Sequence, residues 1–197
     1  SRAHARLPFA QCRISRARRD STEGFPSSAV RDPLGQYRDQ GIAMEFRVLP
    51  AGAPERQQLA EWYHAQWGQD AGLSLEQELQ RLNPPQDAGG FPHLIAAFDG
   101  DQLVGAVQLK RREMQAFPQY EHWLGSVFVA DSHRGRRLAS GLVQQAAAQA
   151  VRMGVSELYL QTEALDGGLY ARLGWKPLQE ADNCSYRVLV MVRRLAA

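Results

Sequence analysis

This sequence contains few cysteines, no long apolar segment and no large excess of charge of either sign. Its two cysteines, Cys12 and Cys184, provide neither a disulfide framework nor a metal-ligand spacing, so no metal is expected. So few cysteines fit a reducing compartment, and a cytoplasmic location is expected. No apolar run is long enough to span a membrane, and a net charge of +2 does not indicate a nucleic-acid binder. The composition is that of one globular domain.

Residues 1–43 differ in composition from the rest of the chain. They carry eight arginines and four acidic residues, a net charge of +4, and their apolar residues follow no helical or strand period. We expect a poorly ordered basic extension here and a folded domain over residues 44–197. The first nineteen residues are Arg-rich without acids, which is also typical of an organelle transit peptide. Sequence upstream of a natural start at Met44 is the preferred interpretation, because the domain pattern begins there.

From Met44 onward, short strands alternate with helices. Hydrophobic periodicity predicts helices at 54–67, 74–82, 138–153 and 166–173, and strands at 46–49, 93–98, 102–110, 122–129, 157–162, 175–178 and 186–193. Ser74 and Gln77 form a capping-box signature, and Asp99-Gly100 is a hairpin turn signal. The strand–helix–strand order across 127–162 predicts a parallel pair joined by a crossover helix. The sequence therefore predicts a single α/β domain with a mixed, mostly antiparallel sheet, a central parallel pair and about four helices.

The junction between the strand ending at Val129 and the helix starting at Leu138 has the features of an anion site. A loop that opens a helix presents unpaired backbone N–H groups, and the helix dipole adds partial positive charge there. Gly135 and Ala139 let a ligand approach the backbone closely. Charge-assisted donors come from Arg134, Arg136 and Arg137. The residues indicate a bound phosphate group, with a solvated basic loop as the alternative.

The same stretch resembles the acyl-CoA-binding motif of the GNAT superfamily of N-acetyltransferases, [Gln/Arg]-x-x-Gly-x-[Gly/Ala]. Arg134 fits the first position and Ala139 the last, whereas Arg137 stands where the pattern has glycine. The resemblance runs from about Met44 to the C-terminus and implies acetyl-CoA as co-substrate, with its pantetheine arm along residues 127–129. It also implies a GNAT-like fold whose parallel pair splays open, with the acetyl thioester in the gap. The implied cofactor-binding residues are Val127, Phe128, Val129, Arg134, Gly135, Arg136, Arg137, Leu138, Ala139 and Ser140.

A second motif follows in residues 169–175, Leu-Tyr-Ala-Arg-Leu-Gly-Trp, which resemble the family signature Leu-Tyr-x-x-x-Gly-[Phe/Trp]. The resemblance implies that the hydroxyl of Tyr170 lies near the thioester sulfur, where a phenol can give the leaving thiolate a proton or a hydrogen bond. An ordinary half-buried aromatic residue is the alternative. Many relatives have asparagine seven residues earlier to contact the cofactor. Here that residue is Glu163, a candidate to face the amine instead.

A base, or a water relay, must take the proton from an ammonium substrate. The candidates are Glu121 and His122 at the start of the 122–129 strand, together with Glu163, and each has a surface role as its alternative. We prefer the Glu121–His122 pair. Strand alternation predicts one shared face for Trp123, Gly125, Val127 and Val129, so that Trp123 either lines the acceptor site or packs in the core.

The function predicted from these residues is acetyl transfer from acetyl-CoA to a primary amine. Direct attack in a ternary complex is expected, because no nucleophilic Cys or Ser motif indicates an acyl-enzyme. A small-molecule acceptor is expected. The alternatives are a protein or peptide N-acetyltransferase and a CoA-binding module without catalysis. Neither nucleic acid nor membrane is an expected partner, and a homodimer is left open.

Overall fold

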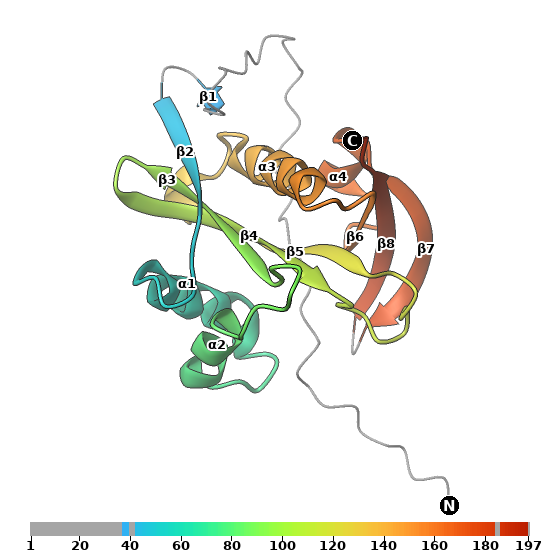
Figure 1. Cartoon of the computed structure of the whole chain (residues 1–197), viewed down its shortest axis with the longest axis horizontal. Helices are drawn as coiled ribbons and strands as arrows, with labels where there is room; N and C mark the ends of the chain where they lie inside the picture. The colour runs from blue at the N-terminus through green and yellow to red at the C-terminus, as the bar shows by residue number, and fades with distance from the viewer. Residues whose placement is uncertain (1–36, 40–41, 184–185, 197) are drawn as a thin grey trace, which may run out of the picture.

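The computed structural model describes residues 37–39, 42–183 and 186–196. They form one eight-stranded sheet in the order β1-β2-β3-β4-β5-β6-β8-β7, in which only β5 and β6 run parallel (Figure 1). The strands are β1 (Tyr37–Asp39), β2 (Ile42–Val48), β3 (His93–Asp99), β4 (Gln102–Arg111), β5 (His122–Val129), β6 (Glu157–Thr162), β7 (Lys176–Asn183) and β8 (Tyr186–Arg194). The predicted mixed, mostly antiparallel sheet with a central parallel pair is thus confirmed.

Strand pairing begins before Met44. β2 starts at Ile42, and β1 pairs with it antiparallel, Tyr37 opposite Met44 and Asp39 opposite Ile42. The predicted extension up to residue 36 and both cysteines lie outside the described residues. The domain boundary at Met44 stays a prediction.

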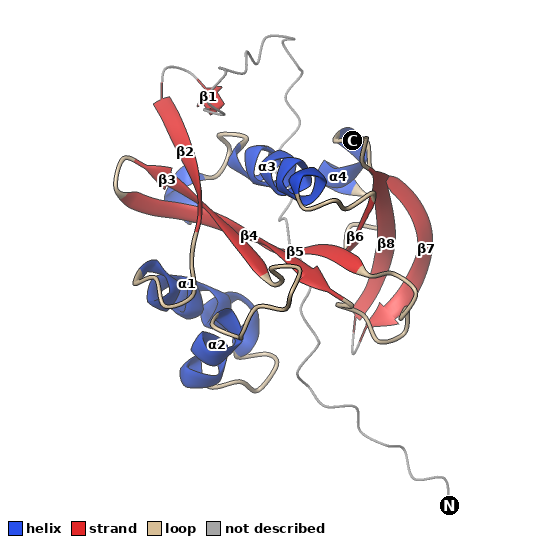
Figure 2. Cartoon of the chain, viewed as in Figure 1, coloured by secondary structure: helices blue, strands red, loops and turns tan. Residues whose placement is uncertain are grey.

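Helices cover both faces of the sheet (Figure 2). One face carries α1 (Glu55–Tyr63) and α2 (Leu75–Leu82), and the other carries α3 (Leu138–Arg152) and α4 (Gly168–Arg172). The expected single helix at 54–67 is α1 followed by a π-helical turn, η2 (His64–Gly68). The predicted capping box opens α2, with the Gln77 amide donating to Ser74 Oγ at 3.1 Å. Among the described residues, no helix combines the length and apolarity that crossing a bilayer requires.

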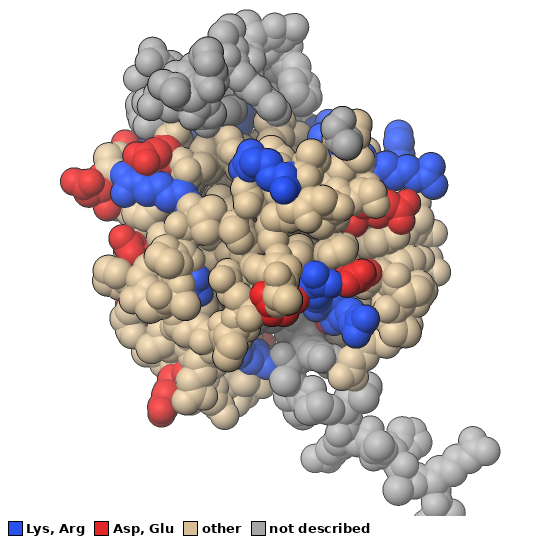
Figure 3. Space-filling model, in the orientation of Figure 1, with Lys and Arg blue, Asp and Glu red and all other residues tan. Residues whose placement is uncertain are grey.

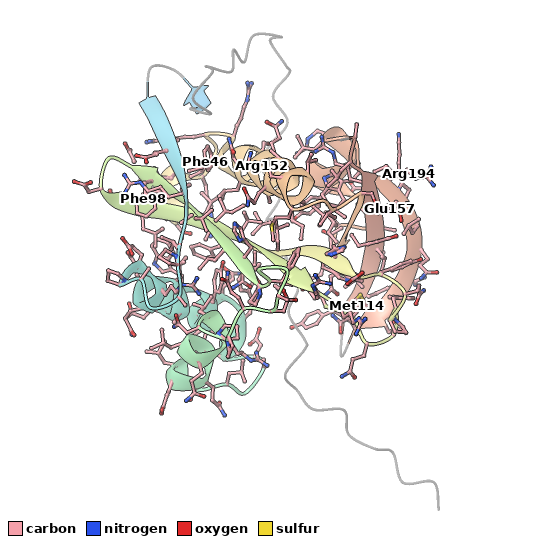
Figure 4. The ribbon with its side chains drawn as sticks, in the orientation of Figure 1. Phe46, Phe98, Met114, Arg152, Glu157 and Arg194 are labelled. Carbon is pink, nitrogen blue, oxygen red and sulfur yellow. The ribbon has the colours of Figure 1, made fainter. Side chains whose placement is uncertain are left out.

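Both faces of the sheet bury apolar clusters. The face under α3 packs against the stripe that the sequence predicts for this helix, including Leu142, Ala146 and Ala150. This helix lies close to β2, because a Cβ added at Gly141 would come within 2.9 Å of Phe46, which points toward α3 in Figure 4. The opposite face carries two clusters, one under α1 and α2 and one at the β5–β6–β8 end of the sheet. The sheet is therefore a central layer between two helical layers.

A bulge in β5 marks the point at which the parallel pair separates. Gln108 of β4 lies opposite Gly125, but Ala106 lies opposite Phe128, so β5 has one extra residue in this interval. Ser126 begins the bulge with φ +53°, in the left-handed region that non-glycine residues rarely adopt. In the described strands, β5 and β6 share a single ladder pair, Trp123 with Tyr159. The parallel pair is therefore splayed from this point onward.

The bulge overturns one expectation from strand alternation. Trp123 packs with Tyr159 and Met114 on the α1–α2 side of the sheet, whereas Val127 packs under α3. The predicted shared face of Trp123, Gly125, Val127 and Val129 is therefore wrong. One additional residue in a strand reverses the side to which every later side chain points.

Charged side chains of both signs are interspersed on the face that Figure 3 shows. Over the described part of this face, basic side chains do not merge into a continuous patch.

Candidate active site

The loop that connects β5 to α3 has a backbone that a ligand can approach closely. After a short 3-10 turn, η3 (Asp131–His133), the chain passes through exposed residues 134–137 and enters α3 at the buried Leu138. Gly135 has φ +76°, and a Cβ added to it would meet no other atom within 4 Å. The open side of Gly135 is therefore accessible to a ligand.

The N-terminus of α3 lacks the groups that usually satisfy it. Its N-cap residue, Arg137, makes no side-chain capping hydrogen bond, and the first turn contains no acidic residue. The first amide in α3 that bonds back along the chain is that of Gly141, which donates to the Arg137 carbonyl at 3.1 Å. Amides at the start of a helix have no intrahelical acceptor and carry partial positive charge. The segment 138–140 is thus suited to an anionic ligand.

The three arginines of the loop have different surroundings. Arg134 is tied to the end of β5, because its Nε donates to the Val129 carbonyl at 3.2 Å and its NH2 lies 2.6 Å from Asp131. Arg136 and Arg137 are exposed. Arg134 therefore links the strand to the loop, and the other two extend their charge toward solvent.

Arg137 adopts φ +54°, a conformation that glycine reaches without strain. We expect Arg137→Gly to keep the free energy of unfolding within about 1 kcal/mol of the parent, because the relieved strain offsets the added freedom of the unfolded chain. Urea unfolding measures this. Arg136→Gly is the matched control, since Arg136 has no positive φ to relieve, and it should be the more destabilising change. If Arg137→Gly were the more destabilising of the two changes, relief of strain at Arg137 would be contradicted.

The side chains at the end of β5 point to different layers. Val127 and Val129 pack toward α3, whereas Phe128 stacks on Trp62 of α1 with ring centroids 5.1 Å apart. The hydroxyl of Tyr63, also in α1, donates to the Ser126 carbonyl at 2.9 Å and holds the bulge. The Phe128 ring therefore lies on the side of the sheet opposite to α3.

Tyr170 lies in α4 with only 1% of its surface exposed. Its ring meets that of Trp175 edge-on, with centroids 6.2 Å apart, within the core cluster under α3. Gly174 ends the short helix with φ +83°, and the Trp175 amide donates back to the Tyr170 carbonyl at 3.1 Å. The signature Leu-Tyr-x-x-x-Gly-Trp is therefore a compact unit that fixes the position of the tyrosine.

The two preferred base candidates lie side by side where β5 starts. Glu121 forms an ion pair with Arg111, which also contacts Asp87 at 2.7 Å. The His122 ring packs against that of Phe91, with centroids 5.2 Å apart. Burial is the main cause that lowers the pKa of His122 below its ordinary value of 6.5. At neutral pH this imidazole is consequently uncharged and able to accept a proton.

The other candidate side chains are placed as follows. Glu163 is half-buried just beyond the end of β6. Trp123 is fully buried, and its indole N–H donates to the Tyr120 carbonyl at 2.7 Å. Of the two interpretations of Trp123, packing in the core is the one that the structure bears out.

The structure also brings together polar residues that the sequence analysis did not single out. Glu113, Lys110 and Gln161 meet on the α1–α2 side of the sheet, next to Gly125. Glu113 lies in the irregular connection after β4, where no periodic pattern marks it. The only available signal was Gly125, because glycine within a strand often indicates that another group approaches closely.

No cluster of three or more His, Cys, Asp and Glu side chains that could hold a metal occurs within residues 37–39, 42–183 and 186–196.

Comparison with known proteins identifies the fold. Among solved structures, aminoglycoside 6'-acetyltransferase type Ii is similar over 78% of this chain and 98% of its own, with 22% identity and a TM-score of 0.62. An aminoglycoside 6'-N-acetyltransferase complexed with coenzyme A matches over 78% and 98% of the two chains, with 19% identity and a TM-score of 0.60. The Salmonella typhimurium protein yncA, with its cofactor acetyl-CoA, matches over 78% and 95%, with 16% identity and a TM-score of 0.59.

Sequence comparison establishes the family. A search of curated proteins found no match. The model of the acetyltransferase (GNAT) family, however, matches residues 56–175, more than half of the chain, and includes the β5–α3 loop and Tyr170. The chain therefore belongs to the GNAT family of acetyltransferases.

Proposed function

We propose that this enzyme transfers the acetyl group of acetyl-CoA to a primary amine of a small molecule, by direct attack within a ternary complex. One observation carries the proposal: the uncapped start of α3 follows β5 after the short connection 130–137, at the end where β5 and β6 have separated. A phosphate-bearing ligand bound at residues 134–140 can extend along Val127–Val129 into this gap. The coenzyme A and acetyl-CoA named for two structural neighbours support acetyl-CoA as the co-substrate here.

The proposed mechanism has two proton transfers, one to the leaving thiolate and one from the amine, and assigns a separate residue to each. The amine nitrogen bonds to the acetyl carbon as the carbon–sulfur bond breaks, and the thiolate leaves with the electron pair. The phenol of Tyr170 supplies a proton or a hydrogen bond to that thiolate. A member of the Glu121–His122 pair receives the proton that the amine gives up. A covalent acyl-enzyme is not required, because no activated nucleophile is part of the proposal.

Thermal unfolding in the presence of acetyl-CoA tests the proposal first. A ligand that binds only the folded state at about a hundredfold excess over Kd stabilises it by about 2.7 kcal/mol. We therefore expect millimolar acetyl-CoA to raise Tm by several degrees, and mass analysis to show an amine that has gained an acetyl group. An unchanged Tm would refute cofactor binding. A raised Tm without product from any amine would instead favour a CoA-binding module.

The dependence of rate on pH tests the base. A base must be unprotonated to act, so activity is present above its pKa and is lost as pH falls through that value. Burial lowers the pKa of His122. The fall of kcat/KM on the acidic side of its pH profile (the acidic limb) should therefore lie below pH 6.5. His122→Gln should abolish this limb, whereas Glu121→Gln and Glu163→Gln should preserve it. Loss of the limb in Glu121→Gln alone would transfer the role to Glu121. A limb retained in all three variants would exclude these side chains and favour a water relay.

A further inference from the structure

A buried histidine lies directly before the proposed cofactor loop. His133 ends the 3-10 turn η3 and is only 7% exposed, whereas its neighbours Ser132 and Arg134 are exposed. The imidazole is held at both nitrogens. Nδ1 lies 2.8 Å from Ser132 Oγ, and Nε2 lies 3.3 Å from Asp99 Oδ2. No step of the proposed reaction uses this histidine, so its burial and its two contacts call for another role.

The contact with Asp99 joins two elements that are far apart in sequence. Asp99 is the last residue of β3, at the turn of the β3–β4 hairpin, whereas His133 follows β5 (Figure 1). The Ala130 amide also donates to the Val104 carbonyl of β4 at 2.9 Å. By contrast, the contacts of Arg134 described above stay within β5 and η3. His133 therefore ties the start of the loop to the hairpin.

The loop of residues 134–137 lies between two buried side chains. His133 precedes it and Leu138, 2% exposed, follows it, whereas all four residues between them are exposed. Arg137 in this loop adopts φ +54°. A non-glycine residue keeps such a conformation only where the surrounding structure holds it. The two buried flanks are therefore the points from which the fold sets the shape of the loop.

The three polar side chains satisfy one another in either charge state of the imidazole. A neutral ring with its proton on Nε2 donates to Asp99 and accepts from the Ser132 hydroxyl, and a protonated ring donates to both. A buried N–H without an acceptor is costly. Loss of the Asp99 carboxylate thus favours movement of the His133 ring. We call Asp99, Ser132 and His133 the loop anchor.

We propose that the loop anchor holds residues 134–137 in the conformation that binds acetyl-CoA. The inference rests on the proposed function and adds two residues to its cofactor site. His133 and Asp99 are positioning residues, because they act through the backbone of the loop. A ligand that meets a preorganised loop loses less free energy to ordering when it binds. The competing role for the loop anchor is stabilisation of the fold alone.

The sign of the effect at Asp99 distinguishes positioning from electrostatics. Acetyl-CoA is polyanionic, so removal of a nearby carboxylate should by itself tighten binding. Positioning predicts the opposite for Asp99→Ala, because this change removes the acceptor for His133. Asp99→Asn removes the same charge but keeps an oxygen acceptor. It should therefore bind acetyl-CoA at least as tightly as the parent does.

Calorimetric titration with acetyl-CoA measures Kd for each folded variant, and Tm without ligand measures its stability. Substitutions that act on a ligand through an intervening contact change affinity by about two- to thirtyfold. We expect Asp99→Ala and His133→Leu each to raise Kd at least about threefold. The double variant should bind no more weakly than His133→Leu, because both substitutions break the same contact.

Two further variants serve as controls. His133→Gln keeps an N–H donor that can reach Asp99, and it should recover most of the affinity lost in His133→Leu. Asp101→Ala removes a carboxylate from the same turn, but the charge of this exposed residue acts on Arg47 of β2. Its Kd should not rise. A rise in Asp101→Ala equal to that in Asp99→Ala would assign the effect to the turn as a whole and overturn the inference.

The outcomes separate this inference from the proposed function. Absence of thermal protection of the parent by acetyl-CoA would refute the proposed function, and the inference with it. With that protection intact, an unchanged or lower Kd in Asp99→Ala and His133→Leu would overturn the inference alone. A lowered Tm with an unchanged Kd would likewise leave the loop anchor a structural role only. If His133→Leu does not fold, Asp99→Ala, at a partly exposed position, decides the question.

Discussion

Replacing Tyr170 with phenylalanine should lower kcat at least about tenfold and leave the thermal protection by acetyl-CoA unchanged. General acid help is typically worth ~10²–10⁴-fold, so even a partial contribution exceeds this limit. Phenylalanine keeps the ring, which is almost fully buried and meets Trp175 edge-on. The substitution therefore removes the hydroxyl without emptying the core. Single-turnover rates and acetyl-CoA titrations by Tm measure the two effects separately.

A second hydroxyl deletion provides the control for Tyr170→Phe. Tyr159 of β6 donates its hydroxyl to Glu157 at 2.7 Å and has no part in the proposed proton transfers. Tyr159→Phe should lower the free energy of unfolding by about 1 kcal/mol and keep kcat. If Tyr170→Phe also keeps full turnover, the assignment of Tyr170 as the acid is wrong, although the cofactor site would stand.

Replacing Gly135 with valine should abolish most of the stabilisation by acetyl-CoA. Gly135 has φ +76° and has open space beside it in the loop that precedes α3. A β-branched side chain would fill this space and would resist the left-handed conformation. We expect acetyl-CoA affinity to fall by at least tenfold, and the shift in Tm at a fixed ligand concentration to shrink accordingly.

Gly52→Val separates the two effects of Gly135→Val, which are the filling of open space beside the loop and the strain on the backbone. Gly52 has φ +78°, and a Cβ added there also meets no atom within 4 Å, but it lies in the turn before α1. It therefore imposes a similar backbone strain outside the cofactor loop. We expect a similar loss of stability without ligand and an undiminished shift with acetyl-CoA. An equal loss of the ligand shift in both variants would show that strain alone explains the result at Gly135.

The sequence predicts the layers of this fold better than its irregularities. Alternating strands and helices, the Asp99-Gly100 turn and the Ser74 capping box mark local structure that forms as expected. The bulge was not predictable, because Ser126 adopts a positive φ only through pairing with β4 and the hydrogen bond from Tyr63. β7 extends to Asn183, although its second half is rich in residues that disfavour strands. Pairing with β8 supplies what local propensity lacks.

The candidate site likewise has parts that local sequence predicts and parts that only long-range contacts create. Residues 134–140 form one contiguous motif and the signature around Tyr170 forms another, so each can be found from the sequence alone. Glu113 and Gln161 are separated by β5 and α3, and only the sheet brings them together at Gly125. Long-range contacts of this kind leave no spacing in a single sequence. The roles of Tyr170, Glu121 and His122 remain predictions that the kinetic tests address.

The single ladder pair between β5 and β6 gives the sheet two edges in its interior. Beyond Trp123 and Tyr159, each strand keeps its outer neighbour, β4 for one and β8 for the other, but does not meet its parallel partner. Exposed edges normally recruit foreign strands and favour aggregation. Here they face each other within one chain, and an extended, amide-bearing ligand has the groups to pair with both. If acetyl-CoA binds as proposed, its extended pantetheine arm would serve as a removable strand, which would join the two halves of the sheet while bound and leave them divided on release.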